Sequence, residues 1–339
     1  MSETTPPSKV TIHDVAQAAG VSISTVSRAF ARPGRVSAAT AKRIRQIADE
    51  LGYRSHIVDA RTPYDEEHLH GMLAITVADI ANPVFADYVK AAQHQCLRKG
   101  FGLVVIDSEE TGVIERSTLQ LTYGHVDGFI LASSRSSDTA IRKIAEIKPV
   151  VTLNRPVRGL PSIIADSTHG LNAAVKRLIE LGHTSLTYLS GPAASWQDGM
   201  RWRVINQLSS EHRIKLRRVP CESPSYGGGY NAAKTFLASP TSAVIAYNDN
   251  IAIGFVAALK HQGMTVPDDV SVVGIDDLPV SVLVEPPISS VRMPRRLLGE
   301  QAVDELIGRL HHTINRPSTE PVMLRSSFVE RASIAAPHD

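Results

Sequence analysis

Aromatic residues, cysteine and long apolar runs are all scarce in this chain of 339 residues. Phe, Trp and Tyr together make up 5% of it, so aliphatic side chains must form most of any core. The two cysteines, Cys96 and Cys221, allow at most one disulfide and fit no Cys-x-x-Cys or zinc pattern. No apolar run reaches the roughly 18 residues of a membrane span, and the first ten residues lack the apolar segment of a secretory signal. We therefore expect a soluble, cytoplasmic protein.

The net charge of +2 conceals an uneven distribution of charge along the chain. Residues 1–62 carry nine Lys and Arg against five Asp and Glu, whereas the remainder carries 27 against 29. A small basic segment on a slightly acidic body favours contact between that segment and a polyanion. The length predicts two or three domains, and the 43% hydrophobic content is enough for a normal core.

The basic segment begins with two short predicted helices. Between Thr11 and Gly20, apolar residues recur at intervals of three and four, with Thr11 as N-cap, Asp14 as its capping-box partner and Gly20 as the helix end. A second helix begins after Ser22 and is expected to turn Val26 and Phe30 toward the first. Two such helices joined by Gly-Val-Ser predict a helix-turn-helix. A third helix runs from the region of Ser37 to Gly52.

The second helix exposes hydroxyl side chains and an arginine. Short hydroxyls reach base edges and phosphates without holding a helix away from the groove, and Arg28 can fork onto a guanine or a phosphate. The alternative is a three-helix bundle whose Ser/Thr face is merely solvated.

The residues themselves favour the first interpretation. The run VTIHDVAQAAGVSISTVSR, with Val36-Ser37 and Glu50-Leu-Gly-Tyr53 after it, resembles the DNA-binding head of the LacI family of bacterial transcription regulators. The resemblance implies that Ile23 and Ser24 read bases in the major groove. It also implies that other residues of the head support these two in the groove or contact the DNA backbone and flanking bases. The predicted DNA-binding residues are Thr11, Ser22, Ile23, Ser24, Thr25, Ser27, Arg28, Arg35 and Ser37.

The chain departs from the family pattern at one position in the head and again in the segment after it. Ala31 stands where Asn is usual, His56 stands where the hinge usually has Asn, and Thr62 stands where a leucine usually wedges into the minor groove. Acidic residues at 65–67 follow and would repel phosphate. We expect a major-groove head joined to the body by an atypical hinge.

From residue 72 onward, short apolar runs alternate with longer amphipathic ones. This pattern predicts parallel sheets covered by helices on both faces, arranged as two doubly wound halves. The predicted strands are 73–77, 103–106, 128–131, 150–153, 185–189, 243–246 and 270–275; the predicted helices are 84–99, 138–146, 170–181, 201–211, 229–237, 251–262 and 297–310. Gly227-Gly-Gly229 is interpreted as a flexible turn, because Tyr-Asn and not Lys-Ser/Thr follows it.

Ligands of such sheets bind beyond the carboxyl ends of the strands. Amides and carboxylates follow the predicted strands, with no nucleophile–base pair, no histidine cluster of metal spacing and no Gly-x-Gly-x-x-Gly. This pattern favours reversible binding of a small hydroxyl-rich ligand over catalysis, and no metal or cofactor is expected.

The family resemblance continues through the body, in Ala81–Phe85, Glu180–His183, Val270–Asp277 and Arg292–Pro294. It implies a fold like that of the periplasmic binding proteins, with these divisions: head 10–54, hinge 55–70, N-terminal lobe 71–165 with 294–324, and C-terminal lobe 166–293 with 325–337. It also implies that Phe85 and Trp196 pack on a ring whose hydroxyls bond to polar residues. The expected effector contacts are Asp79, Asn82, Phe85, Asn154, Trp196, Arg201, Asn248 and Asp276. Asp249 is expected to cap the helix near Ile251 instead.

These observations predict a homodimeric repressor that binds a pseudo-palindromic operator and responds to a small effector, expected to be a sugar. A sugar-binding transport protein shares the body, but the head and the missing secretory signal count against it. A nucleotide-dependent α/β enzyme is a third possibility, and the missing glycine fingerprint counts against that one.

Overall fold

The computed structural model describes residues 10–31, 36–51, 69–314 and 320–337. The chain divides into two units, Met1–Glu67 and His68–Asp339. Most of the predicted hinge, residues 55–70, lies outside the described residues, as do His56 and Thr62.

The first unit contains the three predicted helices, α1 (Ile12–Ala19), α2 (Ile23–Ala31) and α3 (Ala38–Leu51). Their small core is aliphatic and consists of Val15, Ala16, Ala19, Val26, Ala29, Ala41, Ile44 and Ala48. The backbone N–H and the hydroxyl of Thr11 both donate to Asp14 Oδ2 at 2.7 Å, which confirms the predicted cap. Gly20 ends α1 at φ +61°, a conformation that glycine adopts without strain.

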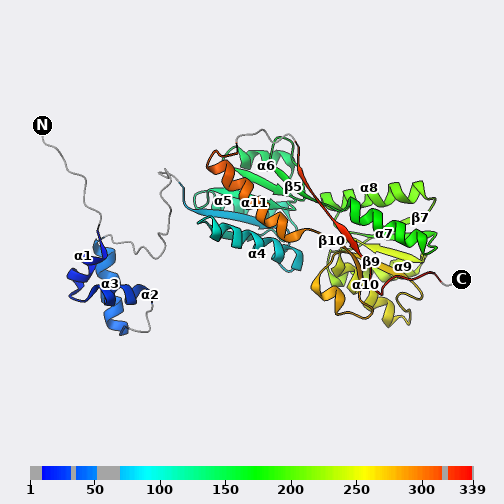
Figure 1. Cartoon of the computed structure of the whole chain (residues 1–339), viewed down its shortest axis with the longest axis horizontal. Coiled ribbons are helices and arrows are strands. Elements are labelled where there is room, and N and C mark those ends of the chain that lie inside the picture. Colours follow the sequence, from blue (N-terminus) through cyan, green and yellow to red (C-terminus); the bar gives the residue numbers. More distant parts are fainter. Residues whose placement is uncertain (1–9, 32–35, 52–68, 315–319, 338–339) are drawn as a thin grey trace. The chain divides into compact units, whose positions relative to one another are not determined.

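The second unit consists of two α/β lobes (Figure 1). The N-lobe sheet has the order β11-β5-β4-β3-β1-β2, and every pairing in it is parallel. Its strands are β1 (Met72–Val77), β2 (Gly102–Asp107), β3 (Gly128–Ala132), β4 (Val150–Leu153), β5 (Ser162–Asp166) and β11 (Val322–Arg325). Its helices are α4 (Pro83–Arg98), α5 (Gly112–Thr122), α6 (Asp138–Ala145) and α11 (Arg295–Leu310).

The C-lobe sheet has the order β12-β10-β9-β8-β6-β7, and only the β10–β12 pairing is antiparallel. Its strands are β6 (Ser185–Ser190), β7 (Lys215–Pro220), β8 (Ala243–Ala246), β9 (Ser271–Asp276), β10 (Ser289–Arg292) and β12 (Ser327–Val329). Its helices are α7 (Thr168–Glu180), α8 (Trp196–Glu211), α9 (Tyr226–Leu237), α10 (Asp249–His261) and the 3₁₀ turn Pro279–Val282. The predicted pair of doubly wound lobes is confirmed.

The chain passes between the two sheets three times. It crosses after β5, again between β10 and α11, and a third time at Ser326 between β11 and β12 (Figure 1). These crossings bring the carboxyl ends of β9 and β10 close to the first turn of α11. A change in structure at one lobe can therefore be transmitted to the other lobe through a few residues.

The interpretation of Gly227–Gly229 as a flexible turn was wrong, because these residues belong to α9. A Cβ on Gly229 would overlap the carbonyl of Ile251, and a Cβ on Gly254 would overlap that of Tyr226. The glycines thus let α9 and α10 approach closely. Within the described ranges, no helix has the length and apolarity that crossing a membrane requires.

Candidate functional sites

The outer face of α2 is polar except at its start. Ser22, Ser24, Ser27 and Arg28 are exposed on it, while Val26 and Ala29 on the opposite face are buried. Ile23 is 40% exposed, although it is a large apolar residue in a small unit with little core. An exposed apolar side chain beside hydroxyls and a cation suits contact with thymine methyl groups and base edges.

The polar side chains of α2 bond chiefly to one another. Ser22 Oγ pairs with Ser24 Oγ at 2.9 Å and with Thr25 Oγ1 at 2.8 Å. Arg28 Nε donates to the carbonyl of Ser24, and Nη2 donates to Ser24 Oγ, both at 3.1 Å. The guanidinium therefore lies along the helix surface, and a base or phosphate can replace these exposed bonds at little cost.

Two further predicted residues lie at helix starts. Thr11 is the N-cap of α1, and Ser37 precedes α3, with its Oγ 2.7 Å from Thr40 Oγ1. Backbone N–H groups at helix N-termini favour phosphate. Arg35 is outside the described residues.

A second candidate site lies between the two lobes of the body. The space there that protein atoms do not fill is about 410 Å³, part of it open to solvent. Six of the eight predicted effector contacts line it: Asn82, Phe85, Asn154, Arg201, Asn248 and Asp276. The other lining residues are Val84, Tyr88, Glu110, Ser133, Arg135, Gln197, Pro224 and Tyr247.

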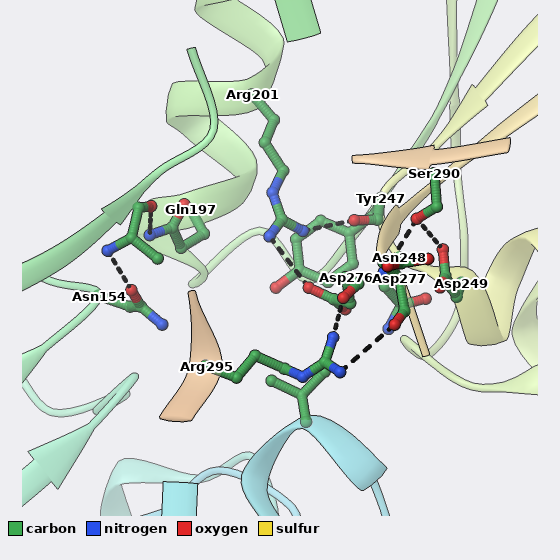
Figure 2. Close-up of polar contacts among 12 residues, drawn as sticks. Asn154, Gln197, Arg201, Tyr247, Asn248, Asp249, Asp276, Asp277, Ser290 and Arg295 are labelled. Atoms are coloured by element: carbon green, nitrogen blue, oxygen red, sulfur yellow. Dashed lines mark hydrogen bonds and ion pairs between the residues drawn. The ribbon is translucent and has the colours of Figure 1, made fainter. Parts of the chain in front are cut away.

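Arg201 and Asp276 form the charged centre of this pocket (Figure 2). Arg201 Nη1 donates to the carbonyl of Tyr247, and its guanidinium carbon lies 4.6 Å from the centroid of that ring. Its Nε is buried with no hydrogen-bond partner among the described residues. A buried arginine with an unused donor is prepared to bond an oxygen atom that the protein itself does not supply.

Asp276 ends β9 in a backbone conformation that few residues adopt. Its φ is +113° and that of Asp277 is +55°. Arg295, at the start of α11, donates to the carbonyls of both residues and to Asp87 Oδ2 at 2.6 Å. Burial raises the pKa of Asp276 to about 7, against the opposing effect of Arg201. The carboxylate is thus held in place through its backbone, and its own oxygens remain directed at the pocket.

The amide side chains of the pocket hold its walls. Asn154 Oδ1 accepts from the N–H of Ala165, and Asn154 Nδ2 donates to the Tyr88 hydroxyl, both at 2.9 Å. Asn248 Oδ1 accepts from the N–H of Ile251 at 2.9 Å, so Asn248 caps α10. The expectation that Asp249 caps this helix was wrong.

Asp249 instead binds together the loops behind the pocket. Its oxygens accept from the N–H of Leu278 and from the hydroxyls of Ser281 and Ser290 at 2.6–2.7 Å. These three partners lie in the segment after β9 and at β10, so Asp249 helps to fix the turn that carries Asp276.

Asp79 and Trp196 are not among the residues that line the pocket. Asp79 accepts from the N–H of Ala81 at 2.8 Å at the turn before α4. Trp196 begins α8, and its neighbour Gln197 lines the pocket instead and donates to the carbonyl of Ala165 at 3.2 Å. The helix was predicted to begin at residue 201, but α8 begins at Trp196. Gln197 therefore lies in the first turn of the helix, where it lines the pocket.

Other lining residues were missed for different reasons. Ser133 was found by the rule that ligands bind beyond strand ends but was not chosen as an effector contact, and the same rule could have found Glu110 after β2. Tyr88 lies inside α4, where its sequence position is that of an ordinary core aromatic residue. No sequence pattern marks Arg135, and only the folded structure shows that it lines the pocket. In the described part of the chain, no three His, Cys, Asp or Glu residues come together as a metal site would need.

Two family models match the chain. The family model "Bacterial regulatory proteins, lacI family" matches residues 11–56, and "Periplasmic binding protein-like domain" matches residues 175–334. The chain is 31% identical over 302 residues to the ribose operon repressor of Bacillus subtilis, covering 88% of this chain and 91% of that protein.

Two solved structures are similar along their whole length. A lac repressor dimer bound to operator and the anti-inducer ONPF has a TM-score of 0.74 and 25% identity, covering 97% of this chain and 100% of that one. A LacI-family regulator from Enterococcus faecalis with bound ribose has a TM-score of 0.71 and 26% identity, covering 78% and 99%.

Proposed function

Because this chain belongs to the LacI family of bacterial regulatory proteins, we propose that it is a homodimeric repressor controlled by a sugar. The observation that carries the proposal is the pocket between the lobes. Arg201 and Asp276 lie side by side in it but are not hydrogen-bonded to each other, so both can bond to a ligand. The site of action is the cytoplasm, where operator DNA is found.

The head reads the operator through α2. Ile23 and Ser24 meet base edges in the major groove, and Arg28 leaves its bonds to Ser24 to fork onto a guanine or a phosphate. Ser22, Thr25 and Ser27 contact bases or phosphates beside them, while Thr11, Arg35 and Ser37 contact the DNA backbone or flanking bases. Two heads of a dimer read the two halves of a pseudo-palindrome.

The effector lies between the lobes. The carboxyl group of Asp276 accepts hydrogen bonds from sugar hydroxyls, Arg201 donates to ring or hydroxyl oxygens, and Phe85 packs against the apolar face of the ring. A sugar is favoured because acid and base are balanced in the pocket and because similar proteins are a ribose operon repressor and a regulator with bound ribose.

Effector binding changes the relation between the lobes, and that change reaches the heads. The coupling free energy of such systems is typically about 1–3 kcal/mol, or roughly 5–150-fold in affinity. Residues at the three crossings, Arg295 above all, are placed to transmit it.

The test is DNA binding by the full-length protein. Fluorescence anisotropy with labelled DNA from its own promoter, and with a scrambled duplex of equal length, measures specific affinity. The same titrations with D-ribose, D-glucose, D-galactose or D-xylose measure the response. We expect specific binding that one sugar shifts at least fivefold. Equal affinity for both duplexes in every condition would contradict the proposal.

A further inference from the structure

We propose that Tyr247 is the specificity-determining wall of the effector pocket and that it limits the effector to a single sugar ring. This inference rests on the proposed function, since it names the class of sugar that the same pocket accepts. It concerns a residue that follows β8 and that lines the pocket directly beside Asn248.

The ring of Tyr247 is held on several sides, and Figure 2 shows one of these contacts, with Arg201. A Cβ on Gly191 would lie 2.6 Å from two atoms of the ring, so the ring rests directly on the glycine backbone. Gly191 is itself fixed, because its N–H donates to Asp198 Oδ1 at 2.7 Å. The guanidinium of Arg201 packs on the ring, and the hydroxyl lies 3.0 Å from Ser195 Oγ. Such a ring cannot swing aside to admit a larger ligand.

Tyr247 also meets the opposite lobe. Tyr247 lines the pocket together with Arg135, which follows β3 of the N-lobe. Burial lowers the pKa of Arg135, but Glu110 and Tyr247 raise it more, so Arg135 stays charged beside Tyr247. Arg135 Nε donates to Glu110 Oε2 at 2.6 Å, and Nη1 donates to the carbonyl of Ser133 at 3.1 Å. Only 5% of the Arg135 side chain is exposed. Two immobilised side chains, one from each lobe, therefore bound the pocket.

The remaining space suits one ring. About 410 Å³ of space lies between the lining residues, and part of it is open solvent, so the enclosed volume is smaller than this figure. A second sugar ring on the side of Tyr247 would have to occupy the volume of the phenol or break the Arg135–Glu110 pair. This wall excludes a second sugar ring by its shape. Because Arg135 is already paired with Glu110, its charge is not available to attract an acidic substituent of the ligand.

The experiment is isothermal titration calorimetry of the full-length protein and four variants. The probes are four monosaccharides (D-ribose, D-xylose, D-glucose and D-galactose) and two disaccharides (cellobiose and lactose). Wild type is expected to bind at least one monosaccharide and neither disaccharide. Tyr247→Ala is expected to raise the ratio of disaccharide to monosaccharide affinity at least tenfold. Tyr247→Phe keeps the ring, so it is expected to exclude both disaccharides while weakening the monosaccharide.

Gly191→Ala perturbs the Tyr247 ring on the side where the ring rests on the Gly191 backbone. The new methyl group displaces the ring from its present position toward the residues that line the pocket, so monosaccharide affinity is expected to fall at least tenfold. Tyr230→Ala, which removes a half-exposed tyrosine of α9 outside the pocket, is the matched control and should change neither sugar affinity. Operator binding and thermal melting of each variant show that it has folded, and Gly191→Ala tests the wall independently if Tyr247→Ala does not fold.

Three results would overturn the inference. If wild type binds cellobiose or lactose as tightly as any monosaccharide, the wall does not exclude a second ring, although the proposed function stands. If Tyr247→Ala folds and leaves the affinity ratio unchanged, another residue sets the limit. If wild type binds its operator but none of the six sugars, the sugar effector of the proposed function is wrong and this inference fails with it.

Discussion

Arg201 Nη2 lies 3.8 Å from Asp276 Oδ1, and the two side chains are only 6% and 7% exposed. This separation is longer than a hydrogen bond, so the two charges attract each other while both keep capacity for a third group. A sugar hydroxyl can accept from the guanidinium and donate to the carboxylate at once. The pair thus explains how the pocket can hold two buried ionisable groups that are still available to a ligand.

Asp276→Asn should weaken sugar binding by roughly 10- to 100-fold, because a hydrogen bond to a charged group is worth about 1.5–3 kcal/mol. Operator affinity without sugar should be unchanged, since the head lies in another unit. Calorimetry and anisotropy on the same preparation measure both quantities. An unaltered sugar titration would show that Asp276 does not touch the effector.

The pKa of Asp276 also predicts how stability depends on pH. Burial raises this pKa from 3.8 to about 7, so the folded protein holds a proton that the unfolded chain releases between those values. The stability that this group contributes is therefore full below pH 4 and is lost as the pH rises through about 7. Asp276→Asn should melt at a higher temperature than wild type at pH 8, and this difference should shrink by pH 5. A difference independent of pH would mean that Asp276 is ionised throughout.

Arg28→Ala should weaken specific operator binding by about 1–3 kcal/mol, as expected when a bidentate contact to a base is lost. Lys260→Ala on α10 removes the same charge from an exposed position of the body, so it is the matched control. Sugar affinity should be the same in both variants. If Arg28→Ala also lost sugar binding, the residue would be needed for folding and not for DNA contact.

Arg295→Ala should reduce sugar affinity about tenfold and should also reduce the effect of sugar on operator binding. The reason is that Arg295 holds the carbonyls of Asp276 and Asp277 and joins them to Asp87 of α4. The adjacent Arg296 is exposed, so Arg296→Ala controls for the loss of one charge at the start of α11. Equal behaviour of the two variants would refute a role for the Arg295 contacts.

Gly254→Ala should destabilise the body by about 1–3 kcal/mol or more, since its Cβ would overlap the carbonyl of Tyr226 where α9 and α10 cross. Gly199 lies in α8 with nothing within 4 Å of the added Cβ, so Gly199→Ala should be stabilising by about 0.5–1 kcal/mol. Chemical denaturation followed by circular dichroism measures both. Similar effects of the two substitutions would argue against close packing of α9 on α10.

Several elements could not be predicted because their residues carry no periodic apolar signal. The serines of β10 are buried, but Ser289 and Ser290 bond to Arg331 and Asp249, so burial there rests on hydrogen bonds and not on hydropathy. In α5, exposed Val113 and Leu121 and the fully buried Glu115 obscure the expected pattern. Glu115 accepts from the hydroxyls of Ser134 and Ser136 at 2.8 Å, contacts that exist only once the lobe is folded.

The sequence alone determined the head, the alternating α/β body and the polar residues at strand ends, because periodicity, capping and strand-end position are local properties of the chain. Asn154 and Asp276 were identified by their positions at strand ends, and Arg201 was identified through the family resemblance. Only the tertiary structure decided which of those polar residues meet. It excluded Asp79 and Trp196 from the pocket lining, assigned the helix cap to Asn248, and brought Tyr247 of one lobe against Arg135 of the other. A pocket between two lobes depends on how three chain crossings align distant strand ends, and no local pattern of residues encodes that alignment.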